Sequence, residues 1–380
     1  MKIAHIGSRG FPGFNAGVEK CLEEICPRLK ARGHDVTLYC SNEVTTAEPI
    51  YKDTIVIRTG AIATKHLETL SRVAVAAWKT LFESYDIVHF HSIGPALLSW
   101  IPRLGGRAKT VVTVHGLDWQ RAKWGPLARW TLKAGEVSSI FFPNRTIVVS
   151  KHLHRYFSEH YHRDLNYIPN GVTLHPPLEP HLIKEKWGLA ERDYILFAGR
   201  LTPEKECHTL IEAYKKIKTN KKLVIAGSNW HSEGYETQLH RQARGHPDII
   251  FAGWAEGDWM KELYSNAYLF CLPSTVEGLS LALLEAMSYG VCPLVSDIPE
   301  NLDVIEDHGV SFETENITDL RSKMEYLLKH PEKTENYGLQ TKRFVAERYS
   351  WDDVTAELEK VYAKLLAPSL RVAHKVGLQP

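Results

Sequence analysis

The chain has 380 residues, of which 44% are apolar and 24% are charged, the balance of a soluble globular protein. This length exceeds one ordinary core and predicts two domains of roughly 150–200 residues each. The formal net charge of +1 creates no global field that would recruit nucleic acid or a membrane.

The N-terminal stretch Lys2–Gly7 is typical of a buried strand that runs into a glycine turn. A secretory signal needs a longer apolar core and a small-residue cleavage site, so none is expected. No apolar run approaches the ~18–20 residues of a membrane span. The six cysteines show no metal-ligand spacing, and most lie in apolar context. We therefore expect a cytoplasmic protein whose cysteines are reduced core residues.

The first half alternates β-rich runs with helical patterns, which is typical of a parallel sheet covered by helices. Apolar residues from Val18 to Leu29 recur at helical spacing, and Gly33 ends that helix. Strands are expected at Lys2–Gly7, Asp35–Cys40, Ile87–His91, Thr110–His115, Thr146–Ser150 and Asn166–Pro169.

The proline-bearing segment Thr173–Pro180 predicts a linker, after which a second strand–helix series resembles a doubly wound sheet. Its strands are expected at Tyr194–Gly199, Lys222–Gly227, Ile249–Gly253, Ala267–Pro273 and Val291–Ser296. A capping box of Ser350 and Asp353 begins the last clear helix. We expect an α/β protein with an N-terminal domain of residues 1–172 and a C-terminal domain of residues 173–349. Helix 350–366 is expected to pack back on the first domain.

The most specific motif is the run 273–280, Pro-Ser-Thr-Val-Glu-Gly-Leu-Ser, in which Glu277 precedes Glu285 by eight residues. A strand ends at Pro273 and a helix begins near Leu279–Leu281, so its free N–H groups and dipole form an anion site suited to a diphosphate. Glu277 would lie beside a sugar on that diphosphate. Glu285, in an apolar helix, needs a polar partner such as a ribose diol. Alone, either glutamate is more simply explained as a solvated loop or helix-rim residue.

A second motif, 197–205, also follows a strand that ends in glycine. Arg200 and Lys205 stand in a loop that Pro203 restrains, and together they could clamp a diphosphate and neutralise its charge as it leaves. Two solvated surface cations are the ordinary alternative. The agreement of this loop with the glutamate pair favours the functional interpretation.

Gly199-Arg200…Lys205 together with Glu277…Glu285 resembles the retaining glycosyltransferases of family 4, and the resemblance covers nearly the whole chain. Within that family it is most similar to bacterial enzymes that build surface or exopolysaccharide chains. The resemblance implies the GT-B architecture, in which two Rossmann-like domains face each other across a cleft.

The resemblance also implies roles for individual residues. Arg200 and Lys205 would hold the donor diphosphate, and Glu285 would bind the ribose. His115 would reach the sugar near its reacting carbon, although a histidine at a strand end is more often a core residue. The transferred sugar and phosphate would be engaged by Glu277 and by the amides of Gly278, Leu279 and Ser280.

The glycine-rich loop Gly7–Glu19 lies between a strand and a helix, where backbone can approach phosphate or acceptor closely. It lacks the Gly-x-Gly-x-x-Gly dinucleotide fingerprint. The family usually has two adjacent glycines where this chain has Ala16-Gly17, so only Gly17 is carried over as a donor contact.

Residues 101–165 hold eleven Lys and Arg against four Asp and Glu. Trp119, Arg121 and Lys123 are the acceptor-side candidates, since basic residues interleaved with tryptophans suit anionic lipid headgroups or a diphosphate-linked acceptor. This would place the protein peripherally on the inner face of the cell membrane. A solvated face with tryptophans packed inward explains the pattern equally well. No nucleic-acid motif accompanies the charge, so no nucleic-acid partner is expected.

No two aspartates stand two apart, so the Asp-x-Asp metal motif of the other large glycosyltransferase architecture is missing. We expect no metal and no cofactor besides a nucleoside-diphosphate sugar as co-substrate. The resemblance implies transfer, with retention, to a glycan or polyprenyl-diphosphate-linked glycan. A uridine donor is favoured, with GDP and dTDP sugars open.

Three other classes of protein are alternatives. They are a GT-B nucleotide-sugar epimerase or hydrolase, a non-catalytic nucleotide-sugar-binding module, and an NAD-dependent oxidoreductase. The missing dinucleotide fingerprint disfavours the last of these.

Overall fold

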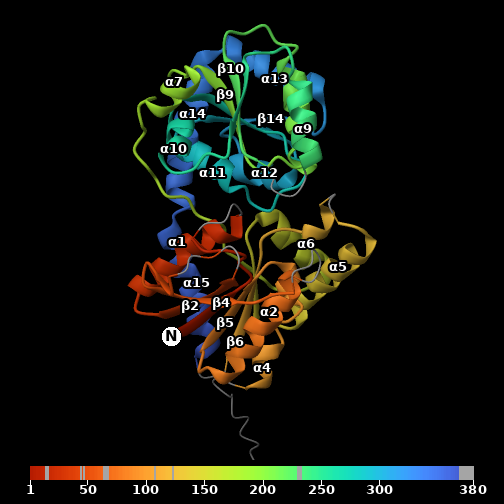
Figure 1. Cartoon of the computed structure of the whole chain (residues 1–380), viewed down its shortest axis with the longest axis vertical. Helices are drawn as coiled ribbons and strands as arrows, with labels where there is room; N and C mark the ends of the chain where they lie inside the picture. The colour runs from red at the N-terminus through yellow and green to blue at the C-terminus, as the bar shows by residue number, and fades with distance from the viewer. Residues whose placement is uncertain are drawn as a thin grey trace, which may run out of the picture.

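The computed structural model describes residues 1–12, 17–42, 45, 48–62, 68–106, 108–121, 124–228 and 233–367. These residues form two lobes stacked along the long axis of the molecule, each built on its own sheet (Figure 1). None of the helices in these ranges is long and apolar enough to cross a bilayer. All six cysteines are buried.

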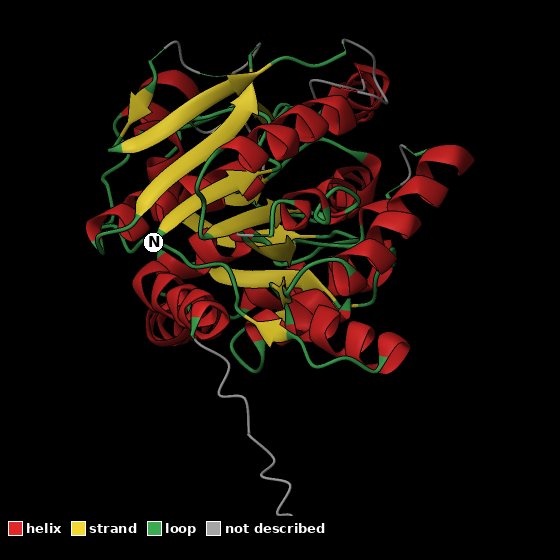
Figure 2. Cartoon of the chain, turned by 90° about the horizontal axis from the view of Figure 1, so that it is seen from below, coloured by secondary structure: helices red, strands yellow, loops and turns green. Residues whose placement is uncertain are grey.

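The first lobe contains an eight-stranded sheet in the order β3-β4-β2-β1-β5-β6-β7-β8. Every neighbouring pair is parallel except β3 and β4. Its strands are β1 (Lys2–Ile6), β2 (Asp35–Ser41), β3 (Ile50–Tyr51), β4 (Thr54–Thr59), β5 (Ile87–His91), β6 (Lys109–Val114), β7 (Arg145–Val148) and β8 (Asn166–Tyr167). Figure 2 shows these strands from below, side by side with helices around them.

The helices of this lobe connect successive strands, as parallel pairing requires. They are α1 (Gly17–Ala31), α2 (Glu68–Lys79), α3 (Ile93–Ala96), α4 (Ile101–Leu104), α5 (Pro126–Phe141) and α6 (Lys151–Tyr161), with short 3-10 turns η1 (Thr80–Phe82) and η2 (Asp118–Gln120). The central strand β5 is buried along its whole length, since helices cover both faces of the sheet.

The second lobe is a six-stranded, all-parallel sheet in the order β11-β10-β9-β12-β13-β14. Its strands are β9 (Tyr194–Ala198), β10 (Lys222–Ala226), β11 (Ile249–Gly253), β12 (Ala267–Leu272), β13 (Cys292–Ser296) and β14 (Val310–Phe312). Its helices are α7 (Leu182–Trp187), η3 (Pro203–Lys205), α8 (Cys207–Tyr214), α9 (Glu233–Gln242), α10 (Asp258–Ser265), α11 (Leu281–Ser288), α12 (Pro299–Ile305), α13 (Ile317–Lys329) and α14 (Pro331–Arg348).

The last helix, α15 (Trp351–Leu366), returns to the first lobe and packs on α1 (Figure 1). Ser350 is its N-cap and accepts from the N–H groups of Asp352 and Asp353, at 3.2 and 3.5 Å. The expected start of this helix is therefore confirmed. The two crossings between lobes run side by side, because Val172 N–H donates to Tyr349 C=O at 2.7 Å.

The expected strands agree with the observed ones to within one or two residues at each end. Three strands were not expected: β3, β4 and β14. Strands β3 and β14 have only two and three residues, too few for a clear pattern, whereas the apolar run 55–57 in β4 was a detectable signal.

Candidate active site

Three loops from the carboxyl ends of β6, β9 and β12 meet where the two sheets face each other. Strands β9 and β12 are parallel neighbours, so the loops that follow them leave the same edge of the sheet. Thr275 N–H donates to Glu204 C=O at 2.9 Å, which ties the loop after β12 to η3. This backbone contact brings the two predicted motifs together.

Lys205 and Glu277 form an ion pair at the centre of this meeting point. Both side chains are largely buried, with 14% and 8% of their surface exposed. Burial lowers the pKa of Lys205, and Glu277 opposes that shift. Each of these buried charges is therefore stabilised mainly by the opposite charge of its partner.

Arg200 lies beside this pair, and burial is the main influence on its charge. Its pKa is lowered first by burial and then by the nearby Arg121 cation, against opposing effects of Glu204, Asp118 and Glu277. An arginine stays protonated in proteins, so Arg200 is a charge held with reduced solvation. An anionic group placed here would be stabilised.

A small cavity of about 40 Å³ lies among these residues and is lined by both lobes. Its lining residues are Gly116, Leu117, Arg121, Arg200, Glu204, Lys205, Val276, Glu277 and Gly278. Three cations and two carboxylates line it, and a third carboxylate, Asp118, pairs with Arg121 at 3.1 Å. Ligand pockets commonly measure roughly 300–1,000 Å³, so admitting a nucleotide sugar requires these loops to separate.

The backbones of the two lobes approach each other closely at this cavity. A Cβ built on Gly278 would lie 1.7 Å from the carbonyl oxygen of His115. Any side chain would therefore push the loop after β12 away from the end of β6. Glycine is needed here for close approach between the lobes.

His115 follows β6 directly and is half-buried behind Gly116. Its Nε2 lies 3.1 Å from Nδ1 of His91. Burial lowers the pKa of His115 to about 4, against a smaller opposing effect of Asp118. The imidazole is therefore neutral at pH 7.

The residues predicted at the start of α11 occupy two different environments. Ser280 is the helix N-cap and its hydroxyl accepts from Leu283 N–H at 3.3 Å, while Leu279 is buried. Glu285 does not line the cavity with Glu277. Its carboxylate lies 3.4 Å from the ammonium of Lys20 on α1, and it also hydrogen bonds to Tyr264.

Gly17 is the first residue of α1, and a Cβ built on it would lie 3.8 Å from Leu281. The starts of α1 and α11 are therefore neighbours across the interface. Two of the predicted donor-binding residues, Gly17 and Glu285, therefore lie where α1 meets α11. Three others, Arg200, Lys205 and Glu277, line the cavity.

The three acceptor-side candidates are separated by the structure. Arg121 lines the cavity and pairs with Asp118 at 3.1 Å. Trp119 is half-buried against the core of the first lobe, and its indole N–H donates to Glu136 at 2.6 Å. Lys123 lies outside the described residues.

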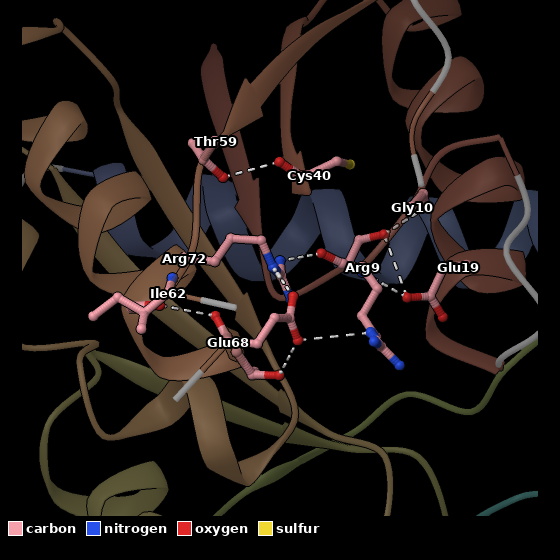
Figure 3. Close-up of polar contacts among 11 residues, drawn as sticks. Arg9, Gly10, Glu19, Cys40, Thr59, Ile62, Glu68 and Arg72 are labelled. Carbon is pink, nitrogen blue, oxygen red and sulfur yellow. Dashed lines mark hydrogen bonds and ion pairs between the residues drawn. The ribbon is translucent and has the colours of Figure 1, made fainter. Parts of the chain in front are cut away.

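A polar network supports the glycine loop after β1 and was not predicted (Figure 3). The buried guanidinium of Arg72 donates to the carbonyl of Ser8 and to Glu68 at 3.1 Å. Glu19, in the first turn of α1, accepts from Arg9 N–H at 2.8 Å. The i, i+4 spacing of Glu68 and Arg72 was a detectable signal. Their contact with Ser8 was not, because the loop is 64 residues away in sequence.

Comparison with known proteins gives matches to both halves of the chain. A model of "Glycosyltransferase Family 4" matches residues 15–175, and one of "Glycosyl transferases group 1" matches residues 181–344. An uncharacterised glycosyltransferase of Methanocaldococcus jannaschii is 33% identical over 172 residues, 44% of this chain and 44% of that protein.

A second relative is the UDP-Gal:alpha-D-GlcNAc-diphosphoundecaprenol alpha-1,3-galactosyltransferase of Escherichia coli. It is 29% identical over 248 residues, 60% of this chain and 62% of that protein. The chain thus matches less than two thirds of the length of either relative.

Two solved structures share the fold over nearly the whole chain. Sucrose-phosphate synthase from Thermosynechococcus elongatus has a TM-score of 0.84 at 19% identity, covering 97% of this chain and 100% of that one. Anabaena HepE, in complex with UDP-glucose, has a TM-score of 0.81 at 17% identity, covering 96% and 100%.

Two Rossmann-like sheets with their loops facing across an interface define the class of this protein as the GT-B glycosyltransferase fold. Because the family models match both halves, the chain belongs to the family 4 glycosyltransferases.

Proposed function

We propose that this protein transfers a sugar from a nucleoside diphosphate to a hydroxyl of a glycan or polyprenyl-diphosphate-linked glycan, with retention of anomeric configuration. The observation that carries the proposal is the cavity at which Arg121, Arg200 and Lys205 converge from both lobes. A diphosphate bound there would accept charge-assisted hydrogen bonds from Arg200 and Lys205. The name of the Escherichia coli relative supports a UDP-linked donor and a lipid-linked acceptor.

In the proposed reaction Arg200 and Lys205 bind the diphosphate and stabilise the charge that develops as it leaves. Glu277 then exchanges its ion pair with Lys205 for contacts to the sugar, while Glu285 exchanges Lys20 for the ribose hydroxyls. The amides at the start of α11 add the positive end of the helix dipole. These cations perform the neutralisation for which other transferases use a metal ion.

Retention follows if the acceptor oxygen attacks on the face from which the diphosphate departs. The bond from the anomeric carbon to the phosphate oxygen breaks, and the bond to the acceptor oxygen forms. The hydroxyl proton passes to an oxygen of the leaving phosphate. No bond between protein and sugar is required.

A donor panel tests this proposal. The protein is incubated with UDP-, GDP- and dTDP-sugars and a polyprenyl-diphosphate-linked acceptor, with and without EDTA, and the product is analysed by mass spectrometry and proton NMR. We expect transfer from one donor class, unaffected by EDTA, with the anomeric configuration of the donor. An inverted product would refute the stereochemistry. Release of nucleotide without a glycan product would favour a hydrolase or epimerase.

We also propose that α5 contacts an anionic membrane surface, where a lipid-linked acceptor would be found. Leu127, Trp130, Val137 and Phe141 fall on one face of this helix and are 79%, 71%, 45% and 50% exposed. Arg129 and Lys133 on the same helix are exposed, and Arg163 lies over the ring of Phe141 at 5.3 Å. An exposed apolar stripe flanked by cations is the pattern of an interfacial helix.

Replacing Trp130 and Phe141 together by serine is expected to weaken binding to anionic phospholipid vesicles at least about tenfold, since both bury apolar area in the interface. Leu339→Ser on α14 is the matched control, because Leu339 is 61% exposed on the other lobe. Vesicle co-sedimentation measures the effect. Equal binding of the double variant and the wild type would remove α5 from the proposal.

A further inference from the structure

A row of histidines runs behind His115 into the core of the first lobe. His5 on β1 and His91 on β5 lie on neighbouring strands, and both are buried. Nδ1 of His5 lies 3.0 Å from Nε2 of His91, and Nδ1 of His91 lies 3.1 Å from Nε2 of His115. The three rings therefore form a continuous hydrogen-bonded chain that ends at His115, whose backbone carbonyl adjoins the cavity residue Gly278.

A further buried histidine, His89, stacks on His91 but does not belong to the chain. Its ring stacks on His91 with centroids 4.3 Å apart. Its two nitrogens are occupied by Tyr362 at 2.6 Å and Thr113 at 2.7 Å. His89 thus shares the burial of the chain members without contacting His115.

The nitrogens of His5, His89 and His91 lie close enough together to suggest a metal site. Hydrogen bonding argues against it, because both nitrogens of His89 and both of His91 already have protein partners. Among the ring nitrogens of His5, His89 and His91, only Nε2 of His5 has no hydrogen-bond partner in the described residues. One unoccupied nitrogen does not make a metal site.

The members of the chain are neutral. Burial lowers the pKa of His5 to about 3 and that of His91 well below its ordinary value, and neighbouring histidines lower the latter further. A neutral imidazole has one N–H group and one lone pair. Each ring can therefore donate in one direction along the chain and accept from the other.

The unpartnered nitrogen decides the direction of donation. If His115 donated inward, His91 would donate to His5, and His5 would hold its proton on Nε2. That N–H group would be buried without an acceptor, and orphaned buried N–H groups are rare in folded proteins. Donation outward leaves only a buried lone pair on His5 and places the proton of His115 on Nδ1.

We propose that His5 and His91 are positioning residues that hold His115 as the neutral, Nδ1-protonated tautomer, so that it serves the bound sugar as a hydrogen-bond donor and not as a base. This inference rests on the proposed function for the identity of the ligand. Nε2 of His115 is occupied by His91, so Nδ1–H is the group available to a sugar oxygen. The ring cannot then accept the acceptor's proton at Nδ1, which agrees with its transfer to the leaving phosphate.

Nitrogen-15 NMR of histidine-labelled protein without donor tests the tautomer directly, because protonated and unprotonated ring nitrogens resonate far apart. His115→Asn assigns the signals. We expect His115 to be protonated at Nδ1 in the wild type and to shift towards the Nε2–H form in His91→Leu. Protonation at Nε2 in the wild type, or an unchanged tautomer in His91→Leu, would overturn the proposal.

Two further variants keep the test decisive if His91→Leu folds poorly. His5→Asn retains an amide donor near the position of Nδ1 and is expected to preserve the tautomer, whereas His5→Leu is expected to lose it. His89→Gln is the matched control, equally buried but outside the chain, and is expected to leave the tautomer unchanged. Stoichiometric Co²⁺ absorption that disappears in His5→Asn would instead establish a metal site and overturn the proposal.

Kinetics separate this proposal from the proposed function. His91→Leu is expected to lower kcat about tenfold with little change in the KM for the donor, because one oriented hydrogen bond is lost in the transition state. A rise in KM alone would contradict a positioning role. If the tautomer is as expected but the wild type transfers no sugar from any donor, the proposed function is wrong. The conclusion that His5 and His91 fix the tautomer of His115 would still hold.

Discussion

Lys205→Met is expected to lower the rate of sugar transfer about 100–1,000-fold, because a preorganised charge on the leaving diphosphate is lost. The same change is expected to destabilise the fold, since Glu277 would remain buried without its partner. Breaking a buried pair by removing one partner typically costs about 3–5 kcal/mol. Steady-state kinetics and denaturant unfolding measure the two effects.

A double-mutant cycle separates these two effects. Lys205→Met combined with Glu277→Gln leaves no unpaired charge, so its unfolding free energy is expected to recover most of the loss while transfer remains abolished. Lys215→Met is the matched control. Its ion pair with Glu212, at 3.0 Å, is more exposed, and its loss is expected to cost less than about 1 kcal/mol. Near-normal turnover in Lys205→Met would remove this lysine from the site.

Gly278→Ala is expected to reduce kcat/KM at least about 100-fold while leaving each lobe folded. The added Cβ would lie 1.7 Å from the carbonyl oxygen of His115, so the loop after β12 must retreat from β6. Displacement of catalytic groups by about 1 Å can cost roughly 100-fold in rate.

Gly234→Ala on α9 is the matched control, because a Cβ built there meets nothing within 4 Å. Its turnover is expected to equal that of the wild type. Unchanged kcat/KM in Gly278→Ala would show that the close approach of the two lobes is not required for transfer.

The convergence of Arg200, Lys205 and Glu277 was predictable from the sequence. Each follows a β-rich run that ends in glycine or proline, and the carboxyl ends of neighbouring parallel strands share one edge. The expected Rossmann-like halves are confirmed by the two parallel sheets. Local apolar patterns were sufficient for these inferences because every strand involved is buried.

Other parts of the site depend on strand order and on contacts between lobes, which local patterns do not contain. His5 and His91 are 86 residues apart and meet only because β1 pairs with β5. Glu285 was expected to need a polar partner, but its partner Lys20 lies on a helix of the other lobe. The ion pair between Lys205 and Glu277 was likewise not predicted, because the two residues are 72 positions apart in the sequence.

Thermal unfolding in the presence of nucleotide sugars tests most directly whether Arg200, Lys205 and the loop of Glu277 form a donor site. A ligand that binds only the folded protein at 100 times its Kd stabilises it by about 2.7 kcal/mol. We expect one class of nucleotide sugar to raise the Tm of the wild type in a concentration-dependent manner, and Arg200→Ala to lose most of that shift. If no nucleotide sugar raises the Tm, or if Arg200→Ala shows the full shift, the donor does not bind at this cavity.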